Sequence, residues 1–375
     1  MRLRGSLFLM AALLAGCGRS GQGEQVFIGH LAPLQSGDKT RFEHTRQGMA
    51  LAIEELNQQH GTTPARQIVV LHVNADEDLE QLQASAVRLL TVNRAIALIG
   101  GQNAAQVERL TRAVQPYESP LITPTMTCPS LVSDSLFSLE PSPTRVAKAA
   151  ARWLNETIKG DALAFVFDNR SPVAAALATS LRAELQQSNS ARLIEISFGP
   201  QPKFNEICDA VRQSKAKAWL FFGKSEDWAG LRRTLHESGS KMSCLVLDSV
   251  GPLELLPSIS ETEGSLYQIT SFFSQEQDKS GATFQANYAK RFHSEADLYA
   301  AQGYDAVRLI GEASSSGKTN AAGRLAVDLT SYFKSPFTSC TGPLTFDATE
   351  HSANRALFLL QKTDKQPRLI LKIEP

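Results

Sequence analysis

The chain has 375 residues, of which 42% are apolar and 20% charged, a composition typical of a globular protein large enough for two domains of about 150 residues each. Its 38 basic and 38 acidic residues give a formal charge of zero at pH 7. This balance argues against the strongly basic surface with which proteins bind nucleic acids or anionic membrane surfaces, so we expect no nucleic-acid partner.

The N-terminus predicts a signal peptide over residues 1–16. Two arginines precede an apolar run at 7–14, which is far shorter than the roughly 20 residues that a membrane-spanning helix needs. The run leads into Leu14-Ala15-Gly16-Cys17, which resembles the lipobox of bacterial lipoproteins. The resemblance implies cleavage before Cys17 and a lipid on its thiol, and the polar, glycine-rich composition of the residues that follow suits a flexible tether over residues 17–25. We therefore expect an extracytoplasmic protein anchored to a membrane of the cell envelope; an ordinary secretory signal or an uncleaved segment is the alternative.

Four cysteines follow the predicted anchor: Cys128, Cys208, Cys244 and Cys340. Their even number suits one or two disulfides in an oxidising compartment, and three pairings of the four are open. No pair has the CxxC spacing of a zinc site or a thioredoxin-like motif, and the seven histidines are scattered without metal-ligand spacing. The sequence thus predicts no metal and no other cofactor.

From Val26 onward, apolar strand-like runs alternate with segments of helical periodicity. In the first half, strands are expected over 26–32, 68–73, 95–99 and 120–123. The third strand leads through Gly100 and Gly101 into a helix for which Asn103 suits the N-cap position. Such a junction lies at the carboxyl edge of a parallel sheet, where amides at a helix N-terminus can receive an anion; an ordinary strand-to-helix turn is the alternative.

The second half repeats this alternation, which predicts a second α/β unit. Its strands are expected over 162–167, 192–198, 218–222 and 244–247, with helices between them. Two late helices, over 281–292 and 298–313, follow both units, and strands over 344–346, 356–361 and 368–373 suggest a terminal antiparallel ribbon. The predicted fold class is α/β with two doubly wound parallel-sheet lobes, the chain returning from the second lobe to complete the first.

Two motif-like patterns do not support catalysis. Ser316-Gly317-Lys318-Thr319 looks like the end of a phosphate-binding loop, but its distance from Gly311 is one residue too long and it follows a helix instead of a strand. No GxSxG pattern occurs, and no GxGxxG pattern follows a strand. We therefore predict that the protein is not an enzyme.

Several segments, weak one by one, are specific in their order and spacing. They are Ile28-Gly29-His30-Leu31-Ala32-Pro33-Leu34 with Ser36-Gly37, the stretch 48–57, Asp76, Ile99-Gly100, the stretches 120–127 and 137–143, the stretch 299–307, and the stretch 341–347. Together they resemble the type I periplasmic solute-binding proteins of the leucine, isoleucine and valine-binding kind, which serve ABC importers. The likeness extends from about Phe27 to the C-terminus.

The resemblance implies two lobes joined by three crossover segments. Residues 26–142 and 273–338 would form lobe 1, and residues 143–272 and 339–375 would form lobe 2. A small polar ligand, an amino acid or a related compound, would be held in the cleft and buried by closure of the lobes. The implied partners are the ligand, the permease subunits of an ABC importer and, through the lipid, a membrane.

The resemblance also carries over ligand-binding positions in the first lobe. In the family, hydroxyl and backbone groups after the third strand and in a Pro-Ala-Ala-Thr-like segment receive the carboxylate and ammonium of the amino acid. The matching positions here are Gln102, Asn103, Ala104, Thr125 and Thr127. The usual serine is absent, because Ala104 or Ala105 stands in its place, which leaves Gln102 or Asn103 as a substitute donor.

In the second lobe the matching positions are Asp168, Arg170, Lys224 and Asp248. Asp248 matches the acidic residue that pairs with the ligand ammonium, whereas Pro172 and Lys224 stand about where the family has tyrosines. These changes predict a more polar cleft that suits a charged or larger polar solute. Two alternatives remain open: solvated loop positions without ligand contact, and a non-transport envelope lipoprotein that uses the fold as a sensory or regulatory interaction module.

Overall fold

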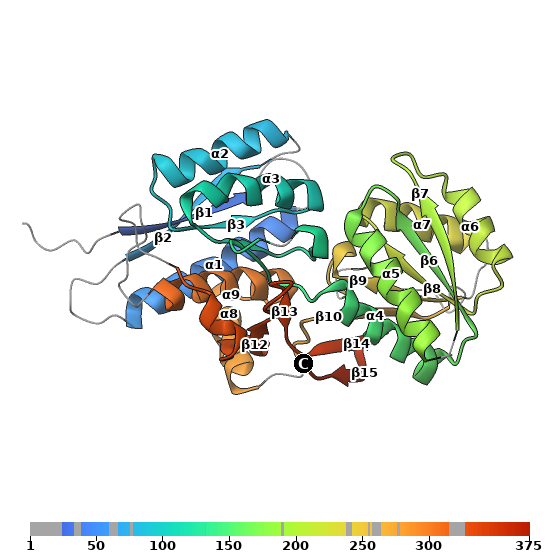
Figure 1. The fold of residues 1–375 in the computed structure, drawn as a ribbon. Helices are drawn as coiled ribbons and strands as arrows, with labels where there is room; N and C mark the ends of the chain where they lie inside the picture. The colour runs from blue at the N-terminus through green and yellow to red at the C-terminus, as the bar shows by residue number, and fades with distance from the viewer. Residues whose placement is uncertain are drawn as a thin grey trace, which may run out of the picture.

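A computed structural model describes residues 25–33, 39–59, 67–75, 78–131, 133–188, 191–237, 242–253, 256, 264–275, 278–314 and 327–375. The predicted signal peptide, Cys17, Asp76, the Ser36-Gly37 pair and the 316–319 stretch lie outside these residues. Within the described part, no helix is long and apolar enough to cross a membrane. The described residues form two lobes that lie side by side, each built around its own sheet (Figure 1).

The first lobe contains a five-stranded parallel sheet in the order β2-β1-β3-β4-β5. Its strands are β1 (Gln25–Ala32), β2 (Gln67–Asn74), β3 (Ala97–Gly100), β4 (Leu121–Thr123) and β5 (Leu136–Ser138). Its helices are α1 (Lys39–Gln59), α2 (Leu79–Thr91), α3 (Ala104–Val114), α8 (Lys279–Phe292) and α9 (Leu298–Ser314). Helices α2 and α3 pack on one face of the sheet, and α1, α8 and α9 pack on the other (Figure 1).

The second lobe contains a seven-stranded sheet in the order β15-β14-β10-β9-β8-β6-β7. Its strands are β6 (Ala162–Asp168), β7 (Arg192–Phe198), β8 (Ala218–Phe222), β9 (Ser243–Leu247), β10 (Leu266–Thr270), β14 (Leu357–Gln361) and β15 (Arg368–Ile373). Its helices are α4 (Pro143–Arg152), α5 (Pro172–Gln187), α6 (Phe204–Gln213) and α7 (Ser225–Glu237). Strand β6 is buried along its whole length, as expected for a central parallel strand covered by helices on both faces.

Shorter elements complete the described chain. A three-stranded antiparallel sheet consists of β11 (Phe337–Ser339), β12 (Gly342–Phe346) and β13 (Ala353–Asn354). Single helical turns cover Gln115–Tyr117, Pro129–Leu131, Asp248–Val250 and Thr330–Phe333, and α4 continues as a π-helical turn over Trp153–Ile158.

The chain passes between the lobes three times, and the predicted fold class is confirmed. The crossings lie between β5 and α4, between β10 and α8, and between β13 and β14. The first and third run side by side, because Ala353 N donates to Glu140 O at 3.2 Å and Ser138 N donates to His351 O at 2.9 Å. Helices α8 and α9 therefore return to the first lobe, and the late helices have the place that the sequence suggested.

The tail differs from the sequence-based expectation in one respect. Leu344, Phe346 and Ala353 pack in the core of the first lobe with residues of α1 and α9. The third crossing accordingly lies between Asn354 and Leu357, not at residue 339, and strand 344–346 does not join the terminal ribbon. Only β14 and β15 pair as that ribbon, at the edge of the second-lobe sheet.

The four cysteines outside the predicted anchor are free, buried thiols, so the disulfides that the sequence left open do not form in this structure. Burial raises the pKa of the Cys208 thiol to about 11 and raises those of Cys244 and Cys340 as well. These side chains act as small core residues.

Candidate functional site

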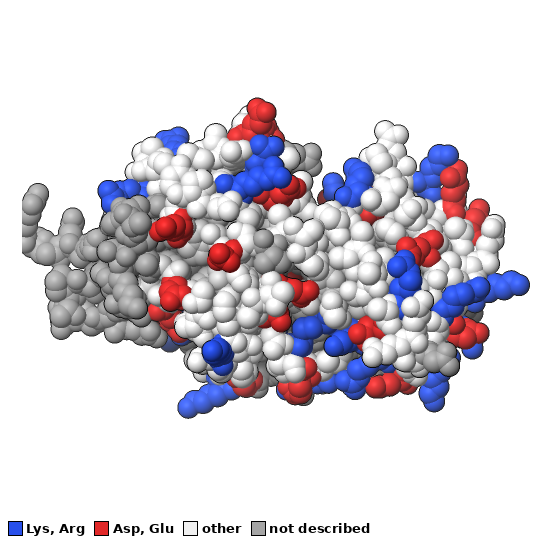
Figure 2. Space-filling model, viewed as in Figure 1, with Lys and Arg blue, Asp and Glu red and all other residues white. Residues whose placement is uncertain are grey.

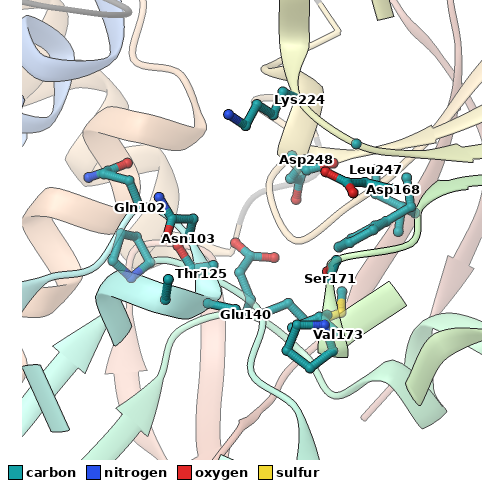
Figure 3. A pocket seen from close by; sticks show the side chains of 18 of the residues that line it. Gln102, Asn103, Thr125, Glu140, Asp168, Ser171, Val173, Lys224, Leu247 and Asp248 are labelled. Atoms are coloured by element: carbon teal, nitrogen blue, oxygen red, sulfur yellow. The ribbon is translucent and has the colours of Figure 1, made fainter. Parts of the chain in front are cut away.

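A cavity of about 520 Å³ lies between the two lobes, where the carboxyl ends of the parallel strands of both sheets face each other. Loops after β3 and β4 supply one wall, and loops after β6, β8 and β9 supply the other (Figure 3). The polar and charged residues that line the cavity are Arg41, Gln102, Asn103, Glu108, Thr125, Glu140, Asp168, Arg170, Ser171, Lys224, Asp248, Ser249, Tyr299 and Gln302. Ligand sites of open α/β sheets occupy this same position at the strand ends.

The first-lobe wall is held in place by a glycine carbonyl. Gly101 has a φ of +89°, a conformation that favours glycine, and its carbonyl oxygen accepts hydrogen bonds from two hydroxyl groups. Thr123 Oγ1 donates at 3.1 Å and Thr125 Oγ1 at 2.6 Å. The loop after β3 is thus fastened to the loop after β4, and Thr125 lies in the wall with its hydroxyl hydrogen already donated.

Helix α3 begins at this wall with a side-chain cap. Asn103 Oδ1 accepts from Gln106 N at 3.0 Å, and Gln106 Oε1 accepts from Gln102 N at 2.9 Å. The predicted N-cap is therefore confirmed, and the side-chain carbonyl of Asn103 is already engaged by an amide of its own helix. Gln102 Oε1, by contrast, is buried and accepts no hydrogen bond from the described residues. Gln102 is the better candidate of the two for a polar contact with a ligand.

The second-lobe wall carries an ion pair between two of the predicted residues. Arg170 Nη2 lies 2.7 Å from Asp168 Oδ2, and Arg170 Nε donates to Asp168 Oδ1 at 2.9 Å. Burial by itself raises the pKa of Asp168, but the hydrogen bonds and charge of Arg170 outweigh burial and hold that pKa below its usual value. The two side chains largely neutralise each other.

Lys224 and Asp248 lie on the same wall. Lys224 is exposed at the start of α7, and Figure 3 shows its side chain extending toward the side of the cavity that carries Gln102 and Asn103. Asp248 follows β9 and is partly buried, and its Oδ2 accepts from Ser271 N at 3.4 Å. A cation and a carboxylate thus face the cavity from one lobe.

Glu140 lies in the central part of the cavity, where the sequence did not predict a site residue. It follows β5 in the first crossing, is only 6% exposed, and accepts a hydrogen bond from Gln302 Nε2. Burial raises the pKa of Glu140 to about 7, although the charge of Arg355, the Gln302 hydrogen bond and the charge of Arg41 all act in the opposite direction. Its position at the end of a parallel strand was the sequence signal that could have identified it.

Two further residues line the cavity from helices that are far along the chain from the loops of its walls. Arg41 of α1 places its guanidinium carbon 5.2 Å from the ring centroid of Tyr299 of α9, a cation–π arrangement. Their meeting depends on the packing of α1 against α9, and no local sequence pattern indicates it.

The predicted site residues are brought together with one difference. Gln102, Asn103, Ala104, Thr125, Asp168, Arg170, Lys224 and Asp248 line the cavity. Thr127 is 8% exposed and lies behind the wall instead of in it. Among the described residues, no group of three or more histidine, cysteine, aspartate or glutamate side chains is arranged to hold a metal ion.

Charges of both signs are interspersed over the face seen in Figure 2, with no extended area of one sign. That distribution agrees with the zero formal charge of the chain.

Comparison with known proteins identifies a family and a fold. The family described as periplasmic binding protein matches residues 25–367. No curated protein sequence matches the chain.

Solved structures of similar fold cover almost the whole chain at low identity. A leucine-binding protein from Thermotoga maritima has 16% identity and a TM-score of 0.78, covering 93% of this chain and 99% of that one. A branched-chain amino acid transporter substrate-binding protein from Streptococcus pneumoniae, in complex with isoleucine, has 17% identity and a TM-score of 0.75, with 92% and 99% covered. An ABC transporter solute-binding protein from R. palustris, in complex with 4-hydroxybenzoate, has 14% identity and a TM-score of 0.79, with 94% and 97% covered.

Proposed function

The chain belongs to the periplasmic binding protein family, and we propose that it is an extracytoplasmic receptor that captures a small polar ligand between its lobes and delivers it to an ABC importer. The observation that carries the proposal is the cavity, whose walls come from the strand ends of both lobes. A ligand that touches both walls binds the closed arrangement better than the open one, and so shifts the population toward closure.

The charges around the cavity favour a ligand with both an acidic and a basic group, as in an amino acid or a related compound. Lys224 and Arg41 offer positive charge, whereas Asp248 and Glu140 offer carboxyl groups. The first turn of α3, including Ala104, adds the positive end of a helix dipole on the opposite wall. The proteins of similar fold are described with leucine, isoleucine or 4-hydroxybenzoate, and the charged second-lobe wall here suits a more polar ligand than those.

Ligand-dependent stabilisation tests the proposal. Calorimetry would measure the thermal unfolding of the mature protein in the presence of each compound of a panel of amino acids, their amides and urea. A ligand at 100 times its Kd stabilises the folded state by about 2.7 kcal/mol, which raises the Tm measurably. Absence of stabilisation throughout the panel would contradict a receptor for this class of compound.

A pair of lysine variants makes the test specific to the cavity. Lys224→Ala removes a charge at the cavity wall, whereas Lys148→Ala removes an exposed charge from α4 outside it. Affinity for an acid-bearing ligand should fall in the first variant only. Equal effects in both would indicate a general change of surface charge.

We also propose that the receptor is tethered by a lipid on Cys17, supported by the likeness of Leu14-Ala15-Gly16-Cys17 to a lipobox. A Cys17→Ser variant should leave the membrane fraction and appear in the soluble extract. Retention of the variant in the membrane fraction would refute lipidation at this residue.

The ion pair between Arg170 and Asp168 supports a second candidate function. The two side chains are paired with each other, so fewer charged groups of the second-lobe wall remain to bind a ligand. In this alternative the protein is a non-transport envelope lipoprotein that uses the fold as a sensory or regulatory interaction module. Co-purification of an envelope protein in the absence of any ligand, together with failure of the ligand panel, would favour the alternative.

A further inference from the structure

Glu140 differs from Asp168 and Asp248 in combining burial with a neutral side-chain hydrogen-bond partner, Gln302, in the crossing between the lobes. Asp168 is paired with Arg170, and Asp248 is partly exposed, but Glu140 is 6% exposed and lies in the crossing that joins the lobes. Figure 3 shows its carboxyl group directed into the space between the Asn103–Thr125 side and the Asp168–Ser171 side.

Side chains from α9, α1 and the third crossing act on the carboxyl group of Glu140. Gln302 of α9 donates to Glu140 and, at 3.4 Å, to Pro124 O, so its amide is fixed between two acceptors. Arg41 of α1 and Arg355 of the third crossing act on Glu140 through their charge. Arg355 is in turn paired with Asp305 of α9, 3.1 Å away. Arg355 therefore already has a carboxylate partner other than Glu140.

A ligand that fills the cavity excludes water from this carboxyl group. If the ligand presents hydrocarbon there, the carboxyl group loses hydrogen bonds to water and gains none. If the ligand presents an N–H group, that group donates a hydrogen bond to the carboxyl group and replaces the hydrogen bonds lost to water. A hydrogen bond to an acidic side chain away from water is stronger than one between two neutral groups.

We propose that Glu140 is the specificity-determining residue of the cavity, selecting ligands that present a hydrogen-bond-donating nitrogen group, an amide or an amine, and rejecting ligands that present hydrocarbon at the same place. This inference rests on the proposed receptor function and adds to it the class of ligand.

The size of the expected selectivity follows from the strength of a hydrogen bond to a charged group. Such bonds contribute about 1.5–3 kcal/mol, which corresponds to a factor of about 10 to 150 in Kd. Two pairs of amino acids isolate this contribution. L-Asparagine and L-leucine have side chains of nearly the same shape, one with an amide and one with two methyl groups, and L-lysine is L-norleucine with an added amine.

The ionisation of Glu140 provides a second readout. Because burial raises the pKa of Glu140 to about 7, its carboxyl group is mostly ionised at pH 8 and mostly protonated at pH 6. The other groups that act on Glu140 are two arginines and the amide of Gln302, which has no charge to lose. Binding of a cationic amine to Glu140 should therefore weaken severalfold from pH 8 to pH 6.

The experiment measures Kd by calorimetry for the four amino acids with wild-type protein, Glu140→Gln, Glu140→Leu and Glu206→Gln. Glu206 lies on α6, outside the cavity, and its side chain is 70% exposed, so it is the matched control. Circular dichroism and the unfolding midpoint of each variant show that it is folded; Glu140→Gln keeps the shape of the side chain should the leucine variant fail to fold.

The proposal expects that wild-type protein and Glu206→Gln bind the nitrogen-bearing member of at least one pair 10-fold or more tightly than its hydrocarbon counterpart. Glu140→Gln should lose the preference for lysine and its pH dependence, and Glu140→Leu should prefer leucine or norleucine. A wild-type preference for hydrocarbon, or selectivity unchanged in Glu140→Gln, would overturn this inference and leave the receptor function standing. If no folded variant binds any of the four, and the wider panel fails as well, both proposals fall.

Discussion

Replacing Asp305 with alanine should destabilise the protein by about 3–5 kcal/mol, because it leaves the Arg355 guanidinium buried without its counter-ion. Asp305 is 0% exposed and Arg355 is 1% exposed, and Asp305 Oδ2 lies 3.1 Å from Arg355 Nη2. The other carboxylate oxygen accepts from Cys340 N at 2.8 Å. One side chain of α9 thus supports both the third crossing and the strand region before β12.

The magnitude follows from what remains after the substitution. Arg355 Nη2 keeps its hydrogen bond to Ser339 Oγ at 2.9 Å, but Arg355 Nε is buried and has no acceptor in the described part of the chain. Breaking one side of a buried ion pair costs about 3–5 kcal/mol, most of it from the charge left behind. Asp305→Asn keeps an acceptor for Cys340 N and removes only the charge, so it should cost less than Asp305→Ala.

Urea unfolding followed by circular dichroism measures these differences. Asp209→Ala is the control, because Asp209 forms an exposed pair with Arg212 on α6. The control should lose less than about 1 kcal/mol. A loss below about 1 kcal/mol for Asp305→Ala would refute the reasoning, since it would mean that Arg355 finds water or another partner at no cost.

Three further predictions concern the cavity and the first lobe. Asp248→Ala should weaken binding of an amine-bearing ligand by about 10- to 150-fold in calorimetry, and unchanged affinity would remove Asp248 from the site. Gly101→Ala should destabilise the protein by about 1–3 kcal/mol in urea, because the new Cβ would lie 2.7 Å from Val107 Cγ2 at a φ of +89°; a neutral effect would show that this loop relaxes freely. Burial lowers the pKa of His30 from 6.5 to about 3, so the unfolded chain binds a proton that the folded chain does not. Stability should therefore fall as the pH is lowered from 6.5 to about 3, by at most about 1.4 kcal/mol per pH unit, and His30→Phe should remove that part of the dependence.

The elements that local sequence specifies were predicted well. The helix start after β3 is an example, since Asn103 forms the N-cap and Val107, Leu110 and Val114 are buried on one face of α3. The strand ends that carry Asp168 and Asp248 were found in the same way, from apolar runs that stop at a polar residue. Hydrogen bonds over three or four residues and helical periodicity decide such features, and both are visible in the sequence.

Features that depend on contacts between residues far apart in the chain could not be predicted from the sequence. Arg41 reaches the cavity only because α1 packs against α9, where the Cβ of any residue replacing Gly48 would lie 1.9 Å from the Ala300 carbonyl oxygen. The partly buried contact between His30 and His72, 2.8 Å between their Nδ1 atoms, results from the register of β1 and β2, which pairs residues 42 positions apart. Histidine spacing along the chain gives no sign of it.

The third crossing was misplaced for a related reason. Strand 344–346 has the alternating pattern of any β-strand, and nothing in three residues indicates which lobe they pair with. The core of the first lobe decides it, because Leu344 and Phe346 fill space beside α1 and α9. Only the packed structure carries that information.

The position of Glu140 bears on how the lobes act on a ligand. Its backbone belongs to the first crossing and is hydrogen-bonded to the third through Ala353, so in the proposed closure it would lie close to the hinge between the lobes. Atoms near a hinge move little when two domains close, and atoms farther from it, on the opposing wall, move more. A ligand donor bound to Glu140 would therefore keep its place during closure. Recognition at Glu140 would then come first, and the charged wall of the second lobe would close onto a ligand that has already been selected.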